Sequence, residues 1–201
     1  MMYLLIDTSL KYPTVSIVKD NKILFLFHEK IDSDMSSKIM PIVDNGFKKI
    51  NKRIEDIDKI FVVNGPGSFT GIRIGVTIAK TIAWALKKEI VTISSLELMA
   101  TTNVDTKYIV PIIDARRGNV FAGIYDTNLN IIKEDKMINL ENLKKTIDSN
   151  YTIVNYDLNN VVIDVLKIIS KHKNDVSLNP HSVNPNYLKL TEAEESRLKN
   201  D

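Results

Sequence analysis

The sequence contains no cysteine, and this excludes disulfide bonds, thiolate nucleophiles, iron–sulfur clusters and every cysteine-based zinc site. Its three histidines, His28, His172 and His181, lie in different segments, so the sequence has no paired-histidine metal motif. The longest uninterrupted apolar runs, such as residues 23–27, are far shorter than the roughly 18 residues of a membrane-spanning helix. We therefore expect neither a metal site nor a membrane-spanning segment.

The chain also carries little net charge. Its 27 lysines and arginines are nearly balanced by 25 acidic residues, which leaves a net charge of +2. This balance argues against an autonomous arm that binds nucleic acid. Two small basic groups occur in the sequence: Lys48, Lys49, Lys52 and Arg53, and Arg116 with Arg117. No aromatic residues are interleaved with them, and we interpret both groups as solvated surface charge.

The first six residues are apolar, but Asp7 follows directly and no basic segment precedes them. This pattern favours a first strand over a signal peptide, and we expect a cytoplasmic protein. At 201 residues, 44% apolar and 26% charged, the chain has the composition of a globular protein that can bury a core.

An internal repeat organises the chain. Residues 3–9, 14–18 and 23–29 read as three consecutive strands, the first ending in Asp7, and the same order returns in residues 109–118, 120–125 and 129–133, where the first strand ends in Asp114. The elements expected after each copy are helices at 36–50, 71–86, 95–100, 140–147 and 160–170 and strands at 59–63, 90–93 and 151–154.

This order predicts a duplicated α/β fold with mixed sheets covered by helices, the second copy being shorter. The boundary falls in the polar stretch 101–107, which gives subdomains at 1–104 and 105–201. A single α/β domain with an antiparallel edge is the alternative. For the tail we expect a loop at 173–185, a docked strand at 187–190 and a frayed, charged end from residue 192.

The densest motif is Asn-Gly-Pro-Gly-Ser-Phe-Thr-Gly-Ile-Arg-Ile-Gly at residues 64–75, between a predicted strand and a predicted helix. It fits neither a Walker A loop, because Ile72 occupies the lysine position, nor a dinucleotide-binding fingerprint, because Thr70 occupies the sixth position. Pro66 restricts φ, and the glycines on either side permit positive φ. We predict a tight strand-to-helix turn capped by Ser68 or Thr70, with phosphate binding at the helix start as the alternative.

The two long predicted helices carry apolar stripes. A helix that is apolar over most of its circumference is covered on more than one side. We expect the two helices either to form a patch open to a partner or to cover one another. Pro41 predicts a kink in the first helix or a start near Ser37.

Asp7 and Asp114 end equivalent strands of the two copies, where duplicated nucleotide-binding folds commonly place acidic groups near metal and phosphate. Alternatively, each carboxylate caps its own following turn. Neither aspartate is followed directly by a glycine that would let a phosphate approach the backbone. Catalysis by this chain alone is therefore not expected.

Several segments spread over nearly the whole chain resemble the bacterial TsaB (YeaZ) family. They are residues 6–9, 65–75, 113–118, 185–189 and 192–194. The family motif loop corresponds here to Gly65, Pro66, Gly67, Ser68, Phe69, Thr70 and Gly71. The resemblance implies a duplicated actin-like (ASKHA, RNase H-like) α/β fold, from which this chain departs in having an abbreviated second subdomain. It also implies a role in forming threonylcarbamoyladenosine (t6A) at position 37 of tRNAs that read codons beginning with A.

The resemblance further implies partners. In this family a catalytic paralogue, TsaD, carries the metal-binding histidines, and the TsaB-like chain is a non-catalytic scaffold that binds TsaD and is joined by the ATPase TsaE. ATP is used by the complex, tRNA is reached through it, and no cofactor is assigned to this chain. The scaffold forms a homodimer when TsaD is absent, and no membrane is involved.

The family's contact surface implies a partner interface on the two long helices, at Met35, Ile39, Val43, Phe47, Ile74, Ile78 and Ile82. In a scaffold, Asp7 and Asp114 would be vestigial nucleotide turns. Two alternatives remain at this stage: a nucleotide-binding enzyme of the actin-like class that uses these two turns, and a peptidase, for which the sequence offers neither a nucleophile nor a metal site. The polar stretch 34–37 stands where family members often have a histidine.

Overall fold

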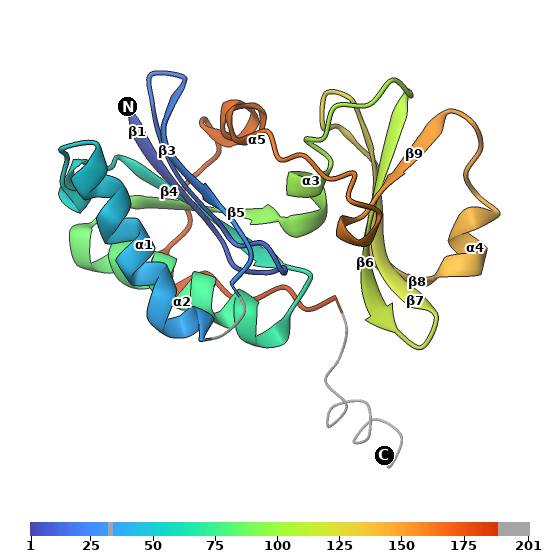
Figure 1. Cartoon of the computed structure of the whole chain (residues 1–201), viewed down its shortest axis with the longest axis horizontal. Coiled ribbons are helices and arrows are strands. Elements are labelled where there is room, and N and C mark those ends of the chain that lie inside the picture. Colours follow the sequence, from blue (N-terminus) through green and yellow to red (C-terminus); the bar gives the residue numbers. More distant parts are fainter. Residues whose placement is uncertain (32–33, 189–201) are drawn as a thin grey trace, which may run out of the picture.

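The computed structural model describes residues 1–31 and 34–188, and contains two mixed β-sheets with helices between and outside them (Figure 1). The charged end expected from residue 192 lies outside the described residues. The duplicated α/β plan expected from the sequence is confirmed, because each sheet is built from a three-stranded meander followed by a parallel strand.

The first sheet has the strand order β3-β2-β1-β4-β5. Its strands are β1 (Met2–Asp7), β2 (Thr14–Lys19), β3 (Lys22–His28), β4 (Lys59–Gly65) and β5 (Glu89–Ser94). β1 pairs antiparallel with β2 and parallel with β4, so that Leu4 lies between Ile17 and Ile60. Every residue of β1 is buried, because the sheet is covered on both faces.

Two helices, α1 (Met35–Lys49) and α2 (Phe69–Leu86), lie side by side on one face of this sheet (Figure 1). Their inward side chains pack on the sheet, with Val43 and Ile72 fully buried. α1 begins at Met35 and continues through Pro41, so the start expected near Ser37 is not observed. Pro41 lacks the N–H that would donate to the carbonyl of Ser37, so one backbone hydrogen bond of the helix is not formed there.

The second sheet has the order β8-β7-β6-β9. Its strands are β6 (Tyr108–Arg116), β7 (Asn119–Asp126), β8 (Ile131–Asn139) and β9 (Tyr151–Val154). The short helix α4 (Leu140–Lys144) covers its outer face through the buried Leu143. With four strands against five in the described residues, the second copy is the abbreviated one, as expected.

Several element boundaries differ from the sequence expectation: β8 runs to Asn139 and not to residue 133, and α4 ends at Lys144 and not at residue 147. β8 begins at Ile131 because residues 126–130 form a turn in which the Asp126 carboxylate accepts the backbone N–H of Asn128 and of Asn130, both at 2.8 Å. The last helix, α5 (Val165–His172), begins later than residue 160 because Asp164 caps it by accepting the N–H of Lys167 at 3.0 Å. Side-chain caps, which act locally, set the starts of β8 and α5.

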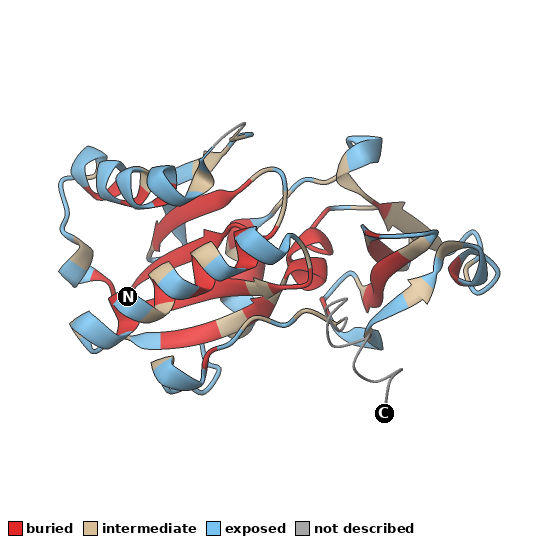
Figure 2. Ribbon diagram, turned by 90° about the horizontal axis from the view of Figure 1, so that it is seen from below, coloured by how far each residue is buried: buried red, intermediate tan, exposed pale blue. Residues whose placement is uncertain are grey.

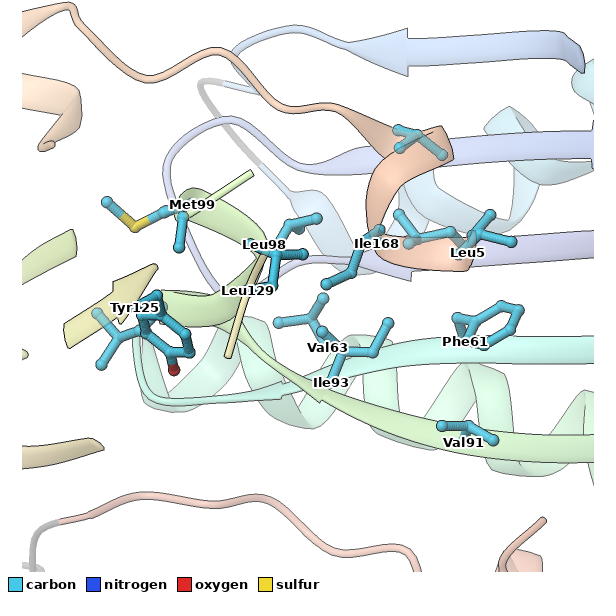
Figure 3. Packing of buried hydrophobic residues seen from close by; sticks show 14 of the residues in the cluster. Leu5, Phe61, Val63, Val91, Ile93, Leu98, Met99, Tyr125, Leu129 and Ile168 are labelled. Carbon is cyan, nitrogen blue, oxygen red and sulfur yellow. The ribbon is translucent and has the colours of Figure 1, made fainter. Parts of the chain in front are cut away.

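A single apolar core lies between the two sheets. It combines residues of the first sheet with residues of α3 (Ser95–Met99), α5 and the second sheet (Figure 3). Phe61 and Ile168 have no exposed surface, and Tyr125 of β7 is 1% exposed. Because both subdomains contribute to this core, they pack against each other through it.

Residues 177–188, which we call the C-terminal strap, return to the first sheet, although the sequence assigned them to the second subdomain. The backbone N–H of Leu178 donates to Ile90 O at 2.9 Å, and that of Asn186 donates to Asn64 O at 2.7 Å. Between these contacts lies the short turn η3 (Pro180–Ser182). Tyr187 is docked, but residues 187–188 form no strand, and residues 189–190 of the expected strand lie outside the described residues.

The 18 residues of α2 meet the length and composition criteria of a membrane-spanning helix. Threonines, one arginine and one lysine are spaced along the helix, so its apolar residues form only short uninterrupted runs. In the structure the buried side of this helix, including Ile72, Val76 and Ala79, packs on the first sheet. A core helix of this kind satisfies the same criteria.

Candidate functional site

The family motif loop, residues 65–71, which we call the glycine loop, joins β4 to α2 through residues 66–68. Ser68 caps α2, because its Oγ accepts the N–H of Gly71 at 3.2 Å. The Ser68 N–H in turn donates to Ser9 O at 2.7 Å, which ties the loop to the turn after β1. The predicted tight turn is confirmed, with Ser68 and not the exposed Thr70 as the cap.

The glycines of this loop are required by close contacts with the chain's own backbone. A Cβ atom on Gly71 would lie 2.1 Å from Thr8 O, and one on Gly67 would lie 2.3 Å from Ser9 O. On Gly65 it would lie 2.3 Å from Asn186 O of the C-terminal strap. The space that a phosphate would need beside these glycines is therefore occupied by protein, which favours the structural role over phosphate binding.

Asp7 ends β1 and is 1% exposed. Its Oδ1 accepts hydrogen bonds from the Ser9 N–H at 2.8 Å and the Ser9 hydroxyl at 2.6 Å. Burial raises the pKa of Asp7 to about 6, although both hydrogen bonds from Ser9 act in the opposite direction. A carboxyl group with such a pKa changes charge close to neutral pH, which is typical of functional groups.

An aromatic cluster lies beside Asp7 and joins the two subdomains. The Tyr12 ring stacks on Tyr156 of the turn η2 (Tyr156–Leu158), with centroids 5.4 Å apart, and the His28 ring lies 6.0 Å from that of Tyr12. Burial, followed by the nearby charge of Asp7, raises the pKa of Tyr156. Sequence reasoning missed this cluster, because its three members belong to segments that only the fold brings together.

Asp114 does not end its strand as expected, because β6 continues to Arg116, and its side chain is exposed. Its Oδ1 accepts the N–H of Arg116 at 2.8 Å, and its Oδ2 lies 3.2 Å from the Arg116 guanidinium. Each aspartate thus caps its own turn through the residue two positions later, as one of the two sequence interpretations predicted. Burial distinguishes the two turns, since only Asp7 lies in the core.

The side chain of His172 is 13% exposed and lies between two carboxylates. Its Nε2 lies 2.9 Å from Glu97 Oε1 and its Nδ1 lies 2.6 Å from Asp175 Oδ2. Burial by itself lowers the pKa of His172, but the hydrogen bonds and charges of the two carboxylates outweigh it and raise the pKa. In residues 1–31 and 34–188, no three His, Asp or Glu side chains form a group that could hold a metal ion.

The helix pair presents fewer interface residues than the sequence predicted. Ile39, Val43, Phe47 and Ile82 are at most 7% exposed and belong to the core under the helices, which corrects their assignment to an exposed interface. Their stripes face the sheet, which is the larger apolar surface available to them. Met35, Ile74 and Ile78 are partly exposed.

The outward side of α2 forms an open groove of about 420 Å³ against the start of α1. Figure 2 shows that both helices are buried toward the sheet and exposed on the opposite side. The groove is lined by Ser36, Thr70, Arg73, Ile74, Thr77 and Ile78. We call this surface the α2 face; it combines one arginine and small polar side chains with two isoleucines.

Aromatic residues mark both ends of the α2 face. At the start of α2, the Arg73 guanidinium lies 3.9 Å from the centroid of the Phe69 ring, and its Nε donates to the Tyr187 hydroxyl at 2.7 Å. Tyr187 stacks on Phe69 with centroids 4.4 Å apart. Trp84, 63% exposed, lies at the other end, beside Pro180 and His181 of the C-terminal strap.

Two mixed sheets of matching strand order, with helices between and outside them, define a protein of the duplicated actin-like (RNase H-like) class. The structure of YeaZ from Pseudomonas aeruginosa superposes with a TM-score of 0.78 at 17% identity, covering 93% of this chain and 99% of that one. The model of the family "tRNA N6-adenosine threonylcarbamoyltransferase" (TsaD) matches residues 29–183.

The chain belongs to the TsaB (YeaZ) family. It is 35% identical over 135 residues to the "tRNA threonylcarbamoyladenosine biosynthesis protein TsaB" of Bacillus subtilis, with 67% of this chain covered, and 31% identical over 134 residues to that of Escherichia coli, with 65% covered. The matched segments span 59% and 57% of the lengths of these relatives.

Proposed function

We propose that the chain is a non-catalytic scaffold subunit in the formation of t6A at position 37 of tRNAs that read codons beginning with A. The names of its relatives support the pathway, and the match to the TsaD family model supports descent from the same domain as the catalytic subunit. The observation that carries the scaffold role is the α2 face, a groove with partly exposed isoleucines on an otherwise well-packed helix pair.

The α2 face has the chemistry of a helix-docking surface. Ile74 and Ile78 lie one turn apart, flanked by the exposed Thr70 and Thr77, whose small side chains permit close approach of a second helix. A TsaD-like subunit descended from the same domain would present a comparable helix pair. The same face would support a homodimer when that subunit is absent, and a TsaE-like ATPase would join the pair, with ATP and tRNA handled by the complex.

The candidate catalytic groups are in contact with other parts of the chain itself, and this supports a non-catalytic role. The glycine loop is filled by the backbone of residues 8, 9 and 186, the Asp7 carboxylate is bound by Ser9, and Asp114 is paired with Arg116. None of these groups is arranged around a space in which a substrate would react.

Ile78→Glu is expected to weaken association with the TsaD-like subunit at least tenfold, because it places a charge in the groove where the partner's apolar side chains would bury it. Light-scattering mass of the chain alone and mixed with the TsaD-like subunit of the same organism measures this. Ile131→Glu is the matched control, since Ile131 is 51% exposed on the other subdomain. Unchanged association of the Ile78 variant would contradict the proposal.

A Val43→Glu variant is unsuitable for this test, although the sequence predicts Val43 as an interface residue. Val43 has no exposed surface, so a glutamate there would place an unpaired charge in the core. Such a variant reports on folding and not on docking.

A second candidate function, nucleotide binding, is favoured by one observation: the buried Asp7, whose pKa is raised to about 6, next to the junction of the two subdomains. A calorimetric titration of the chain with Mg²⁺–ATP tests it. Stoichiometric binding that is lost in Asp7→Asn would support an actin-like nucleotide site. No heat of binding in the wild-type chain would remove this candidate.

A further inference from the structure

The outward side of α2 has the residue spacing of a helix–helix seam. Its outward positions follow one another at alternating intervals of four and three residues, which is the heptad spacing that lets one helix pack along another. Each of these residues is exposed or half-buried, and we call them the α2 seam: Thr70, Ile74, Thr77, Thr81 and Trp84. The seam runs along the α2 face and continues to the end of the helix.

Basic side chains flank the α2 seam on one side. Arg73 and Lys80 are seven residues apart, so they lie on the same side of the helix at a separation of about 10 Å along its axis. The other flank carries Ile78 and Ala85, which have no charge. Residues 69–88 contain no aspartate or glutamate. The charge beside the seam is therefore positive along the whole helix.

Arg73 and Lys80 are held in place by uncharged groups. The Arg73 guanidinium lies 3.9 Å from the centroid of the Phe69 ring, and its Nε donates to the Tyr187 hydroxyl at 2.7 Å. The Lys80 ammonium donates to Val183 O of the C-terminal strap at 3.1 Å. Within the part of the chain that the structure describes, neither cation forms an ion pair. The strap thus positions both charges beside the seam without neutralising them.

The neighbouring helix α1 does not supply the missing negative charge. Its one acidic residue, Asp44, pairs with Lys48 at 2.6 Å. Asp34, which precedes the helix, accepts the Ser36 hydroxyl at 2.9 Å. The carboxylates of this helix pair are therefore already engaged within the chain.

A second copy of the chain is electrostatically a poor occupant of the seam. Residues beside such a seam set partner choice through their charges. In an antiparallel pair of α2 helices centred next to Thr77, Arg73 of one copy would face Lys80 of the other, and like charges in such positions cost affinity. In a parallel pair, these cations would face Ile78 and Ala85. Neither arrangement brings a carboxylate to them.

We propose that the α2 face binds a partner helix that carries acidic side chains seven residues apart, opposite Arg73 and Lys80, in preference to a second copy of this chain. The seam residues pack on the partner's apolar side chains, and the two cations pair with its carboxylates at the rim. Such rim pairs mainly determine partner choice and association rate. The inference rests on the docking role proposed above, to which it adds the charge of the partner.

Two variants of Arg73 separate its charge from its packing. In calorimetric titrations with the TsaD-like subunit of the same organism, Arg73→Gln is expected to weaken binding about two- to fivefold at low salt and to reduce the loss of affinity caused by added salt. Arg73→Lys keeps the charge but loses the flat contact with Phe69, and it should stay within about twofold of the wild-type chain. Lys52→Gln, at an exposed position outside the seam, is the control and should leave the affinity unchanged.

Arg73→Glu distinguishes the partner from a second copy. It is expected to weaken binding to the TsaD-like subunit about tenfold and to strengthen self-association, measured by sedimentation equilibrium, because the introduced carboxylate would face Lys80 of the other copy.

Equal losses of affinity in Arg73→Gln and Arg73→Lys would overturn the proposal, because they would assign the effect to packing on Phe69 and Tyr187. Partner binding that does not change with salt would also overturn it, as would self-association that falls together with partner binding in Arg73→Glu. Failure of the proposed scaffold function would appear differently, as no association of the wild-type chain with the TsaD-like subunit at either salt concentration.

Discussion

Asp7→Asn is expected to raise the free energy of unfolding by about 3 kcal/mol at pH 7.5, with the difference disappearing near pH 4. The pKa of Asp7 is raised by burial from its ordinary value of 3.8 to about 6 in the folded chain. A difference of this size corresponds to about 3 kcal/mol, at 1.36 kcal/mol for each pKa unit. Asparagine keeps the oxygen that accepts from Ser9 but carries no charge.

The sign follows from proton binding. Between about pH 4 and pH 6 the folded chain holds a proton on Asp7 that the unfolded chain has released, so the stability of the wild-type chain falls as pH rises through this window. Because asparagine does not titrate, the stability gained by the variant grows across the same window. Urea unfolding at pH 4 and pH 7.5 measures both differences.

Asp114→Asn is the matched control, because Asp114 makes the same turn at an exposed position. Its effect is expected to stay below about 0.5 kcal/mol at both pH values. A gain for Asp7→Asn that is equal at pH 4 and pH 7.5 would contradict the prediction. A gain confined to neutral pH would mean that the chain retains at Asp7 a charge that costs stability, which is the pattern expected of a functional group.

Gly71→Ala is expected to lower the free energy of unfolding by about 3 kcal/mol, even though alanine is the better helix former by about 1 kcal/mol. The added Cβ would lie 2.1 Å from Thr8 O, a backbone atom in the turn after β1 that cannot rotate away. To relieve the contact, α2 and this turn would have to separate. Urea unfolding of the purified variant at pH 7.5 measures the loss.

Gly75→Ala, one turn further along α2, provides the comparison. Here the Cβ would lie 2.4 Å from Thr8 Oγ1, a side-chain atom that can turn aside at the cost of its hydrogen bond to Gly71 O, about 1 kcal/mol. The gain in helix propensity offsets much of this cost. We therefore expect a loss of about 1 kcal/mol or less, and an equal or larger loss than in Gly71→Ala would refute the explanation by backbone contact.

The repeat and its strands could be predicted because each strand carries its own pattern. Residues 109–125 repeat the alternation and the aspartate-capped turn of residues 3–18, and these signals act over a few neighbours along the chain. The glycine loop could be recognised as a tight strand-to-helix turn for the same reason. Its contacts with Thr8, Ser9 and Asn186 could not, since they come from distant segments.

The sequence by itself determined the elements, their duplicated order, the glycine loop and the family to which the chain belongs, because local propensities and motifs encode all of these. The tertiary structure alone decided which side of each element is covered. The apolar stripe of Ile39, Val43 and Phe47 could pack equally well on a partner protein or on a sheet. In the structure it packs on the first sheet. Asp7 and Asp114 have the same local pattern, yet only Asp7 is buried. Burial depends on segments far apart in the sequence, and no local pattern encodes their approach.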